Sequence, residues 1–291
     1  MTRWLTGLWR IPAATYRSLA RHDVFVLAGA IAYSALLSFF PLVIATIALL
    51  SQFVDEKTAQ QAVVGVLTPY LPPGVPQVVQ NTLEGAIRER ATAGALATLA
   101  LLWTATAVAS TLRHSLNRLL EAPAARPFLR RKAVELAMVA MGGALIVLSV
   151  AANAALTVVG ELPALAGIMG AVRTSAAWNA LASAGPWILS GTAFLVVYRF
   201  LPNVRLRRRS LLAGCVIATA LFQLSTHAFL WYLRTLAHYP LAYGPLAGVV
   251  ILMVWVYLGA LVTLVCAALM RQAEDFMIRQ KEPILPQGAG A

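Results

Sequence analysis

Carboxylates, the groups most used for metal-dependent and acid–base chemistry, are few and scattered in this chain. A two-metal nuclease needs several of them gathered around its ions. The sequence contains no His-Glu-x-x-His, P-loop or Gly-x-Ser-x-Gly element. We therefore expect no catalytic residues, no metal and no cofactor, and no ATP-driven pumping by the chain itself. The acidic residues lie in connections and near the ends of apolar stretches: Asp23, Asp55, Glu56, Glu84, Glu89, Glu121, Glu135, Glu161, Glu274, Asp275 and Glu282.

Polar side chains within long apolar stretches form the first candidate site. Tyr33, Ser34 and Ser38 precede Pro41 in the uncharged stretch Ala28–Leu50. Proline removes one backbone hydrogen bond, so a kink is predicted near Pro41, and the freed carbonyl needs a partner in lipid. The hydroxyls either line a groove or only satisfy the backbone opened by the proline, and the sequence favours neither interpretation.

A second polar set consists of Asn153, Gln223 and His227. His227 is the one ionisable residue near the centre of an apolar stretch, and Gln223, four residues earlier, shares its helix face. These groups could form a proton-sensitive polar spot on a translocation path. They could instead fix packing through an inter-helix hydrogen bond, and this interpretation is slightly favoured.

The elements that position these residues are predicted to be membrane-spanning helices. The chain is 60% hydrophobic and only 12% charged over 291 residues, which is typical of a polytopic membrane protein. We predict an all-α bundle without a secretory signal peptide, with Cys215 and Cys266 as free thiols. Residues 1–23 are predicted to form an amphipathic interfacial helix, residues 55–90 to form two short amphipathic periplasmic helices, and residues 271–291 to form a cytoplasmic tail. The six predicted spans lie at about 28–54, 91–112, 133–159, 179–200, 211–233 and 245–270.

The basic residues set the predicted orientation. With six spans both termini share a side, and that side holds all of the 23 Lys and Arg residues except Lys57, Arg88, Arg90, Arg173 and Arg234. The positive-inside rule then places both termini in the cytoplasm of a bacterial inner membrane. This distribution accounts for the net charge of +12 without nucleic acid as a partner. The partners expected instead are membrane lipids, whose anionic headgroups would meet Arg130, Arg131, Arg205, Arg207 and Arg208.

Four stretches resemble the YihY/BrkB family of bacterial inner-membrane proteins. They are AGAIAYSALLSFFPL (28–42), LRHSLNRLLEAPAARPFLRRK (112–132), YRFLPNVRLRRRSLLAG (198–214) and YGPLAGVVILMVWVYLGALVTLV (243–265). The resemblance covers about residues 20–270 and implies six spans, with links to virulence, serum resistance and lipid movement toward the outer membrane. The chain departs from the family where Cys266-Ala267-Ala268 replaces Gly-Ala-Glu and where Phe222-Gln223 replaces Trp-Glu.

Three functions are compatible with these observations. The first is movement of phospholipid or an anionic glycolipid, with Tyr33, Ser34, Ser38, Pro41, Asn153, Gln223 and His227 along the path. The second is export of a small solute through an enclosed polar cavity. The third is a non-transporting scaffold whose segment 55–90 docks an envelope protein partner. A groove open to lipid, an enclosed pocket and a filled bundle would distinguish the three.

Overall fold

The computed structural model describes residues 2–52, 55–68, 71–73, 75–81, 106–122, 127–141, 144, 148, 176–204, 206–235 and 247–279. Within these ranges the chain forms helices and the turns between them, with no β-strand. Residues 75–81 and 128–141 are also helical. The labelled helices are α1 (Thr2–Arg21), α2 (Val24–Leu50), α3 (Glu56–Leu67), α6 (Ala107–Leu119), α9 (Ala176–Phe200), α10 (Arg208–Thr235) and α12 (Ala247–Arg279).

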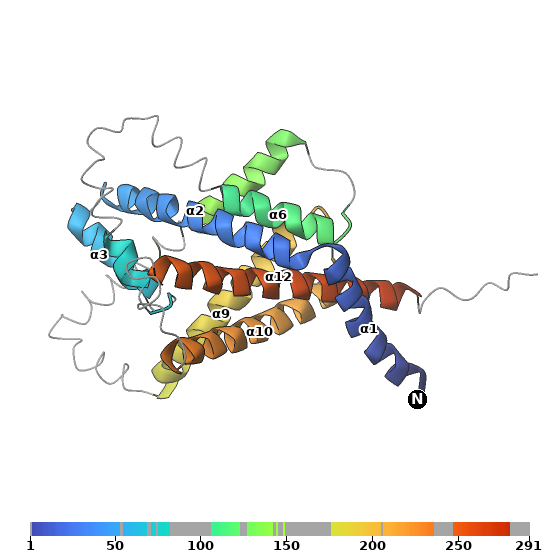
Figure 1. Cartoon of the computed structure of the whole chain (residues 1–291). Helices are drawn as coiled ribbons and strands as arrows, with labels where there is room; N and C mark the ends of the chain where they lie inside the picture. Colours follow the sequence, from blue (N-terminus) through green and yellow to red (C-terminus); the bar gives the residue numbers. More distant parts are fainter. Residues whose placement is uncertain are drawn as a thin grey trace, which may run out of the picture.

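Helix α12 is the centre of the bundle. It packs against α2 and α10, and Figure 1 shows it running between these two helices. It also contacts α1 and α6, while α9 packs on α10 and α3 packs on α2. The central position of α12 follows from its composition, because a helix that is apolar on all sides is stable only when other apolar surfaces cover it.

Two hydrophobic clusters hold the bundle together, one in each half. The first joins the beginning of α2 to the ends of α6 and α9 and the second half of α12, around Ile31, Leu116 and Leu264. The second joins the end of α2 to α3, residues 75–81 and the first half of α12, around Ile47 and Leu252. The short segments after α2 therefore close one end of the bundle, as an amphipathic connection should.

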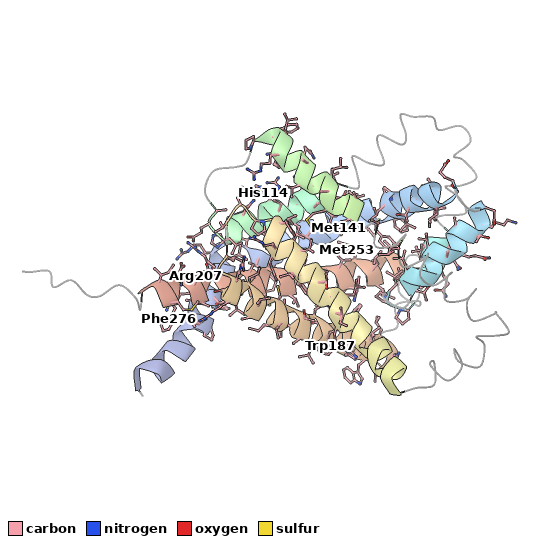
Figure 2. All side chains as sticks on the ribbon, turned by 180° about the vertical axis from the view of Figure 1, so that it is seen from behind. His114, Met141, Trp187, Arg207, Met253 and Phe276 are labelled. Atoms are coloured by element: carbon pink, nitrogen blue, oxygen red, sulfur yellow. The ribbon has the colours of Figure 1, made fainter. Side chains whose placement is uncertain are left out.

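Three helices are long and apolar enough to cross a membrane: Val24–Ala48, Arg208–Thr235 and Ala247–Ile278. They coincide with the first, fifth and sixth predicted spans. Most of the second and third predicted spans lies outside the described residues, so the number of six remains a prediction. The described helices support a polytopic membrane protein, as does the apolar outer surface on α2, α9 and α10, which includes exposed Phe25, Val26, Trp187, Val216 and Trp231. Trp187, near the middle of α9, points outward (Figure 2).

The predicted helix at the amino terminus is present as α1. Its inner side rests on α12, where Thr15 is buried, and its outer side exposes Tyr16 and Arg17. The predicted segment 55–90 begins with α3, whose first turn is capped by Asp55. The Asp55 carboxylate accepts hydrogen bonds from the Thr58 amide at 2.9 Å and the Thr58 hydroxyl at 2.7 Å.

The helices around the predicted basic loop 113–132 are longer than hydropathy suggests. Helix α6 continues to Leu119, and residues 128–141 are helical from Phe128 onward. Arg113 is buried in this extension. A buried arginine is tolerated only when an anion and hydrogen bonds compensate its charge, so Arg113 needs an acidic partner within the bundle.

Candidate functional site

Ser34 and Ser38 hold α6 against α2. The Ser34 and Thr111 hydroxyls lie 2.9 Å apart, and the Ser38 hydroxyl accepts a 3.3 Å hydrogen bond from the Val108 amide in the first turn of α6. The first amides of a helix have no partner within the helix, and Thr106 gives α6 no side-chain cap of its own. Ser38 therefore supplies from another helix the acceptor that α6 needs.

Tyr33 and Pro41 are placed differently from the two serines. Tyr33 is 58% exposed, because one residue along a helix turns the side chain by about 100°. Helix α2 continues without interruption through Pro41, and the Thr46 hydroxyl donates to the Leu42 carbonyl at 2.8 Å. The predicted kink at Pro41 remains a prediction. Ser34 and Ser38 therefore make the contact with α6, and the Tyr33 side chain is turned away from it.

Gln223 and His227 lie on the other side of α12, where α10 meets α9. The buried Gln223 side chain donates to the Ser190 hydroxyl at 3.3 Å, and Ser190 donates to the Pro186 carbonyl at 2.7 Å. The His227 ring nitrogen lies 2.7 Å from the Gln223 carbonyl, and the imidazole is exposed. Asn153 lies outside the described residues. Gln223 therefore pairs across the α9–α10 contact, whereas Ser34 and Ser38 pair across the α2–α6 contact.

The predicted headgroup-binding arginines lie on two segments. Arg130 is exposed and Arg131 lies over the Phe128 ring, 5.2 Å from its centre. Arg207, labelled in Figure 2, and Arg208 are exposed at the start of α10. Among the described residues their side chains carry no salt bridge, while the Arg207 main-chain amide donates to Glu274 on α12. Arg205 lies outside the described residues.

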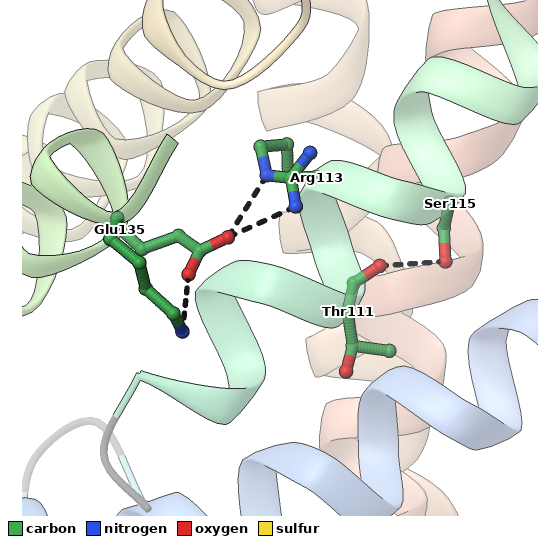
Figure 3. Close-up of polar contacts among 5 residues, drawn as sticks. Thr111, Arg113, Ser115 and Glu135 are labelled. Carbon is green, nitrogen blue, oxygen red and sulfur yellow. Dashed lines mark hydrogen bonds and ion pairs between the residues drawn. The ribbon is translucent and has the colours of Figure 1, made fainter. Parts of the chain in front are cut away.

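A buried ionic cluster that was not predicted from the sequence surrounds Glu135 (Figure 3). The Nε and Nη2 atoms of Arg113 both lie 3.0 Å from Oε1 of Glu135, and Nζ of Lys132 lies 2.9 Å from Oε2. Glu135 is 0% exposed and Arg113 is 7% exposed. The spacing of Lys132 and Glu135 is a readable i, i+3 signal. The arginine, 22 residues away, is supplied only by the packing of α6 against residues 128–141.

Two further contacts anchor the segment between α9 and α10. The buried Tyr198 hydroxyl donates to the Thr263 carbonyl on α12 at 2.8 Å, and the Asn203 amide donates to the Asn117 side chain on α6 at 2.7 Å. The turn before Arg207 is therefore fixed to two other helices. The described residues contain no group of histidine, cysteine and acidic side chains arranged to hold a metal ion. What the arrangement offers chemically is an apolar surface that ends in exposed arginines.

Comparison with known proteins gives a consistent family match. The virulence factor BrkB family matches residues 15–287. A UPF0761 membrane protein of Pseudoalteromonas atlantica is 30% identical over 256 residues, covering 88% of this chain and 83% of the relative. One from Aliivibrio salmonicida is 30% identical, covering 84% and 77%, and one from Chlorobium luteolum is 30% identical, covering 84% of this chain but only 56% of the relative. No solved structure matches the chain.

Proposed function

Because the chain belongs to the virulence factor BrkB family of membrane proteins, we propose that it helps an anionic phospholipid or glycolipid cross or leave the bacterial inner membrane. The observation that carries this proposal is the start of α10. Exposed arginines there adjoin an exposed apolar stripe along the same helix. The two parts correspond to the headgroup and the acyl chains of a lipid.

The stripe follows from helix periodicity. Arg208 is followed at a spacing of four by Leu212 and Val216. Residues four apart lie close together on a helix surface, and both apolar side chains are exposed, Val216 by 69%. Each arginine near an anionic surface contributes about 1 kcal/mol. A lipid phosphate beside Arg208 and Arg209 would leave its acyl chains along α10.

The neutral hydrogen bonds within the bundle suit the next step of the proposed movement. A charged headgroup cannot enter hydrocarbon without polar groups that replace water. Ser34 and Ser38 between α2 and α6, and Gln223 between α10 and α9, offer neutral hydrogen bonds at helix contacts. In this proposal they exchange partners with the headgroup when a helix pair separates, and no strong charge pair traps the lipid.

The proposed orientation has both termini in the cytoplasm. Figure 1 shows α1 and the end of α12 at one end of the bundle and α3 at the other, as this orientation requires. Single cysteines at the exposed positions Gln61 on α3 and Arg118 on α6 should label from opposite sides of the membrane, in a chain without Cys215 and Cys266. Labelling of both positions from the periplasm would contradict the orientation.

The function is tested by reconstituting the purified protein in liposomes with headgroup-labelled phosphatidylglycerol. Exposure of the label on each leaflet reports movement, and binding to phosphatidylglycerol over phosphatidylcholine reports selectivity. Arg208→Gln and Arg209→Gln should each weaken selective binding about fivefold. Arg234→Gln removes the same charge from the exposed far end of α10 and should leave this selectivity unchanged.

A missing partner could abolish movement, so binding and cell phenotype are measured in parallel. The lipid proposal is abandoned for solute export if three results coincide: no selective binding of anionic lipid, no selective movement of it, and no envelope-lipid phenotype when Ser38 and Gln223 are substituted.

A further inference from the structure

The start of α10 already holds an anion that belongs to the protein. Oε1 of Glu274, on the last part of α12, accepts a 2.6 Å hydrogen bond from the main-chain amide of Arg207, the residue before α10. The amides that begin a helix are unpaired and carry partial positive charge, so they attract phosphate and carboxylate groups. Glu274 is 6% exposed, and it therefore occupies this position as a buried carboxylate.

Within the part of the chain that the structure describes, no side-chain cation pairs with this carboxylate. Its neighbour Asp275 pairs with Arg271 at 3.6 Å, but among the described ion pairs none includes Glu274. A buried carboxylate normally needs a charged partner and several hydrogen bonds. The Glu274 carboxylate instead contacts a main-chain amide at the start of a helix. An external anion could bind to the same groups equally well.

Groups suited to a phosphate remain unused at the same helix end. The side chains of Arg207, Arg208 and Arg209 are exposed and, in the ranges described, form no salt bridge. Ser210, in the first turn of α10, is only 7% exposed, and among the described residues its hydroxyl has no hydrogen-bond partner. A phosphate has three or four oxygens and can engage amides, hydroxyl and arginines together, whereas a single carboxylate oxygen engages one amide.

We propose that Glu274 is a built-in competitor for a phosphate group at the start of α10. Its carboxylate closes the position, and a phosphate that binds there displaces it and releases the last two turns of α12. The inference rests on the proposed function when the phosphate belongs to a lipid headgroup. A free phosphate has the same chemistry, and the experiment separates the two sources.

The test compares Glu274→Gln with Asp275→Asn. The glutamine keeps an oxygen that can accept from the Arg207 amide but carries no charge, while Asp275→Asn removes the same charge from the adjacent, half-buried residue. Binding is measured with phosphatidylglycerol in nanodiscs, phosphatidylcholine as reference, and inorganic phosphate in detergent. Glu274→Gln should bind phosphatidylglycerol about fivefold more tightly than the native protein, and Asp275→Asn should not differ from it.

A second measurement needs no substitution. In the native protein, phosphatidylglycerol or phosphate should increase amide hydrogen exchange in residues 271–279, because the displaced helix end loses its contact. Unchanged exchange there would overturn the proposal even if Glu274→Gln failed to fold.

The remaining outcomes are distinct. Equal gains in both variants would mean a general effect of net charge and would overturn the competitor role, as would no gain in Glu274→Gln with any probe. If the native protein binds phosphatidylglycerol selectively but Glu274→Gln does not gain, this inference fails and the proposed function stands. A gain for inorganic phosphate without any selective lipid binding would support the competitor role and remove the lipid function.

Discussion

Glu135→Ala should destabilise the protein more than any other change in its ionic cluster. Glu135 gives one carboxylate oxygen to two nitrogens of Arg113 and the other to Lys132, and it is fully buried. Its removal leaves the buried Arg113 guanidinium without its anion. Breaking a buried pair in this way costs about 3–5 kcal/mol.

The three members of the cluster should differ in a defined order. Arg113→Met leaves Glu135 paired with Lys132, so its cost should be smaller than that of Glu135→Ala. Lys132→Met should cost least, because the Lys132 side chain is 30% exposed and pairs at i, i+3, where such contacts contribute only about 0.2–1 kcal/mol. The double change Arg113→Met, Glu135→Leu removes both charges and should recover much of the loss, since apolar replacements of buried pairs are often neutral.

The assay is reversible unfolding in mixed detergent micelles, followed by circular dichroism for the native protein and the four variants. Ser115→Ala serves as control. The buried Ser115 hydroxyl donates a 2.9 Å hydrogen bond to the Thr111 carbonyl on its own helix, so its removal breaks no contact between helices in the cluster. If Glu135→Ala costs no more than Lys132→Met, or if the double variant is less stable than Glu135→Ala, the pair does not balance charge as described.

Two further predictions follow from the geometry. At Gly214, an added Cβ would contact the buried Met270 side chain, so Gly214→Ala should lower stability by about 1–3 kcal/mol. Combined with Met270→Ala it should cost less than the sum of the two single changes in the same unfolding assay, and additivity would contradict the close approach. At α3, the Thr58 hydroxyl and amide hold the pKa of the Asp55 carboxyl below its ordinary value. The first turn of α3 should therefore stay protected from hydrogen exchange above about pH 4 and lose protection as the pH falls through the lowered pKa, whereas Asp55→Asn should keep a cap without this pH dependence.

The sequence alone determined the class of protein and the main helices. Long apolar runs leave few alternatives to membrane-spanning helices, because only a helix satisfies its own backbone in lipid. The predictions of the first, fifth and sixth spans rest on this rule, and that of α1 rests on its amphipathic pattern. The family resemblance that accompanied them is confirmed. Cys215 and Cys266 are free and buried, as small apolar-like side chains in such runs should be.

The tertiary structure decided which polar groups meet. A hydropathy pattern does not tell how one helix is rotated against another. That rotation pairs Ser34 with Thr111 and Gln223 with Ser190. Composition also ranked Glu135 with the scattered acids, whereas packing buried it against Arg113 and extended α6 past the predicted end of its span. A polar residue in an apolar chain needs a hydrogen-bonding or charged partner. The identity of that partner depends on contacts between helices far apart in the sequence. Physically, the low dielectric of the bundle makes each such contact obligatory, and only the fold chooses the residue that supplies it.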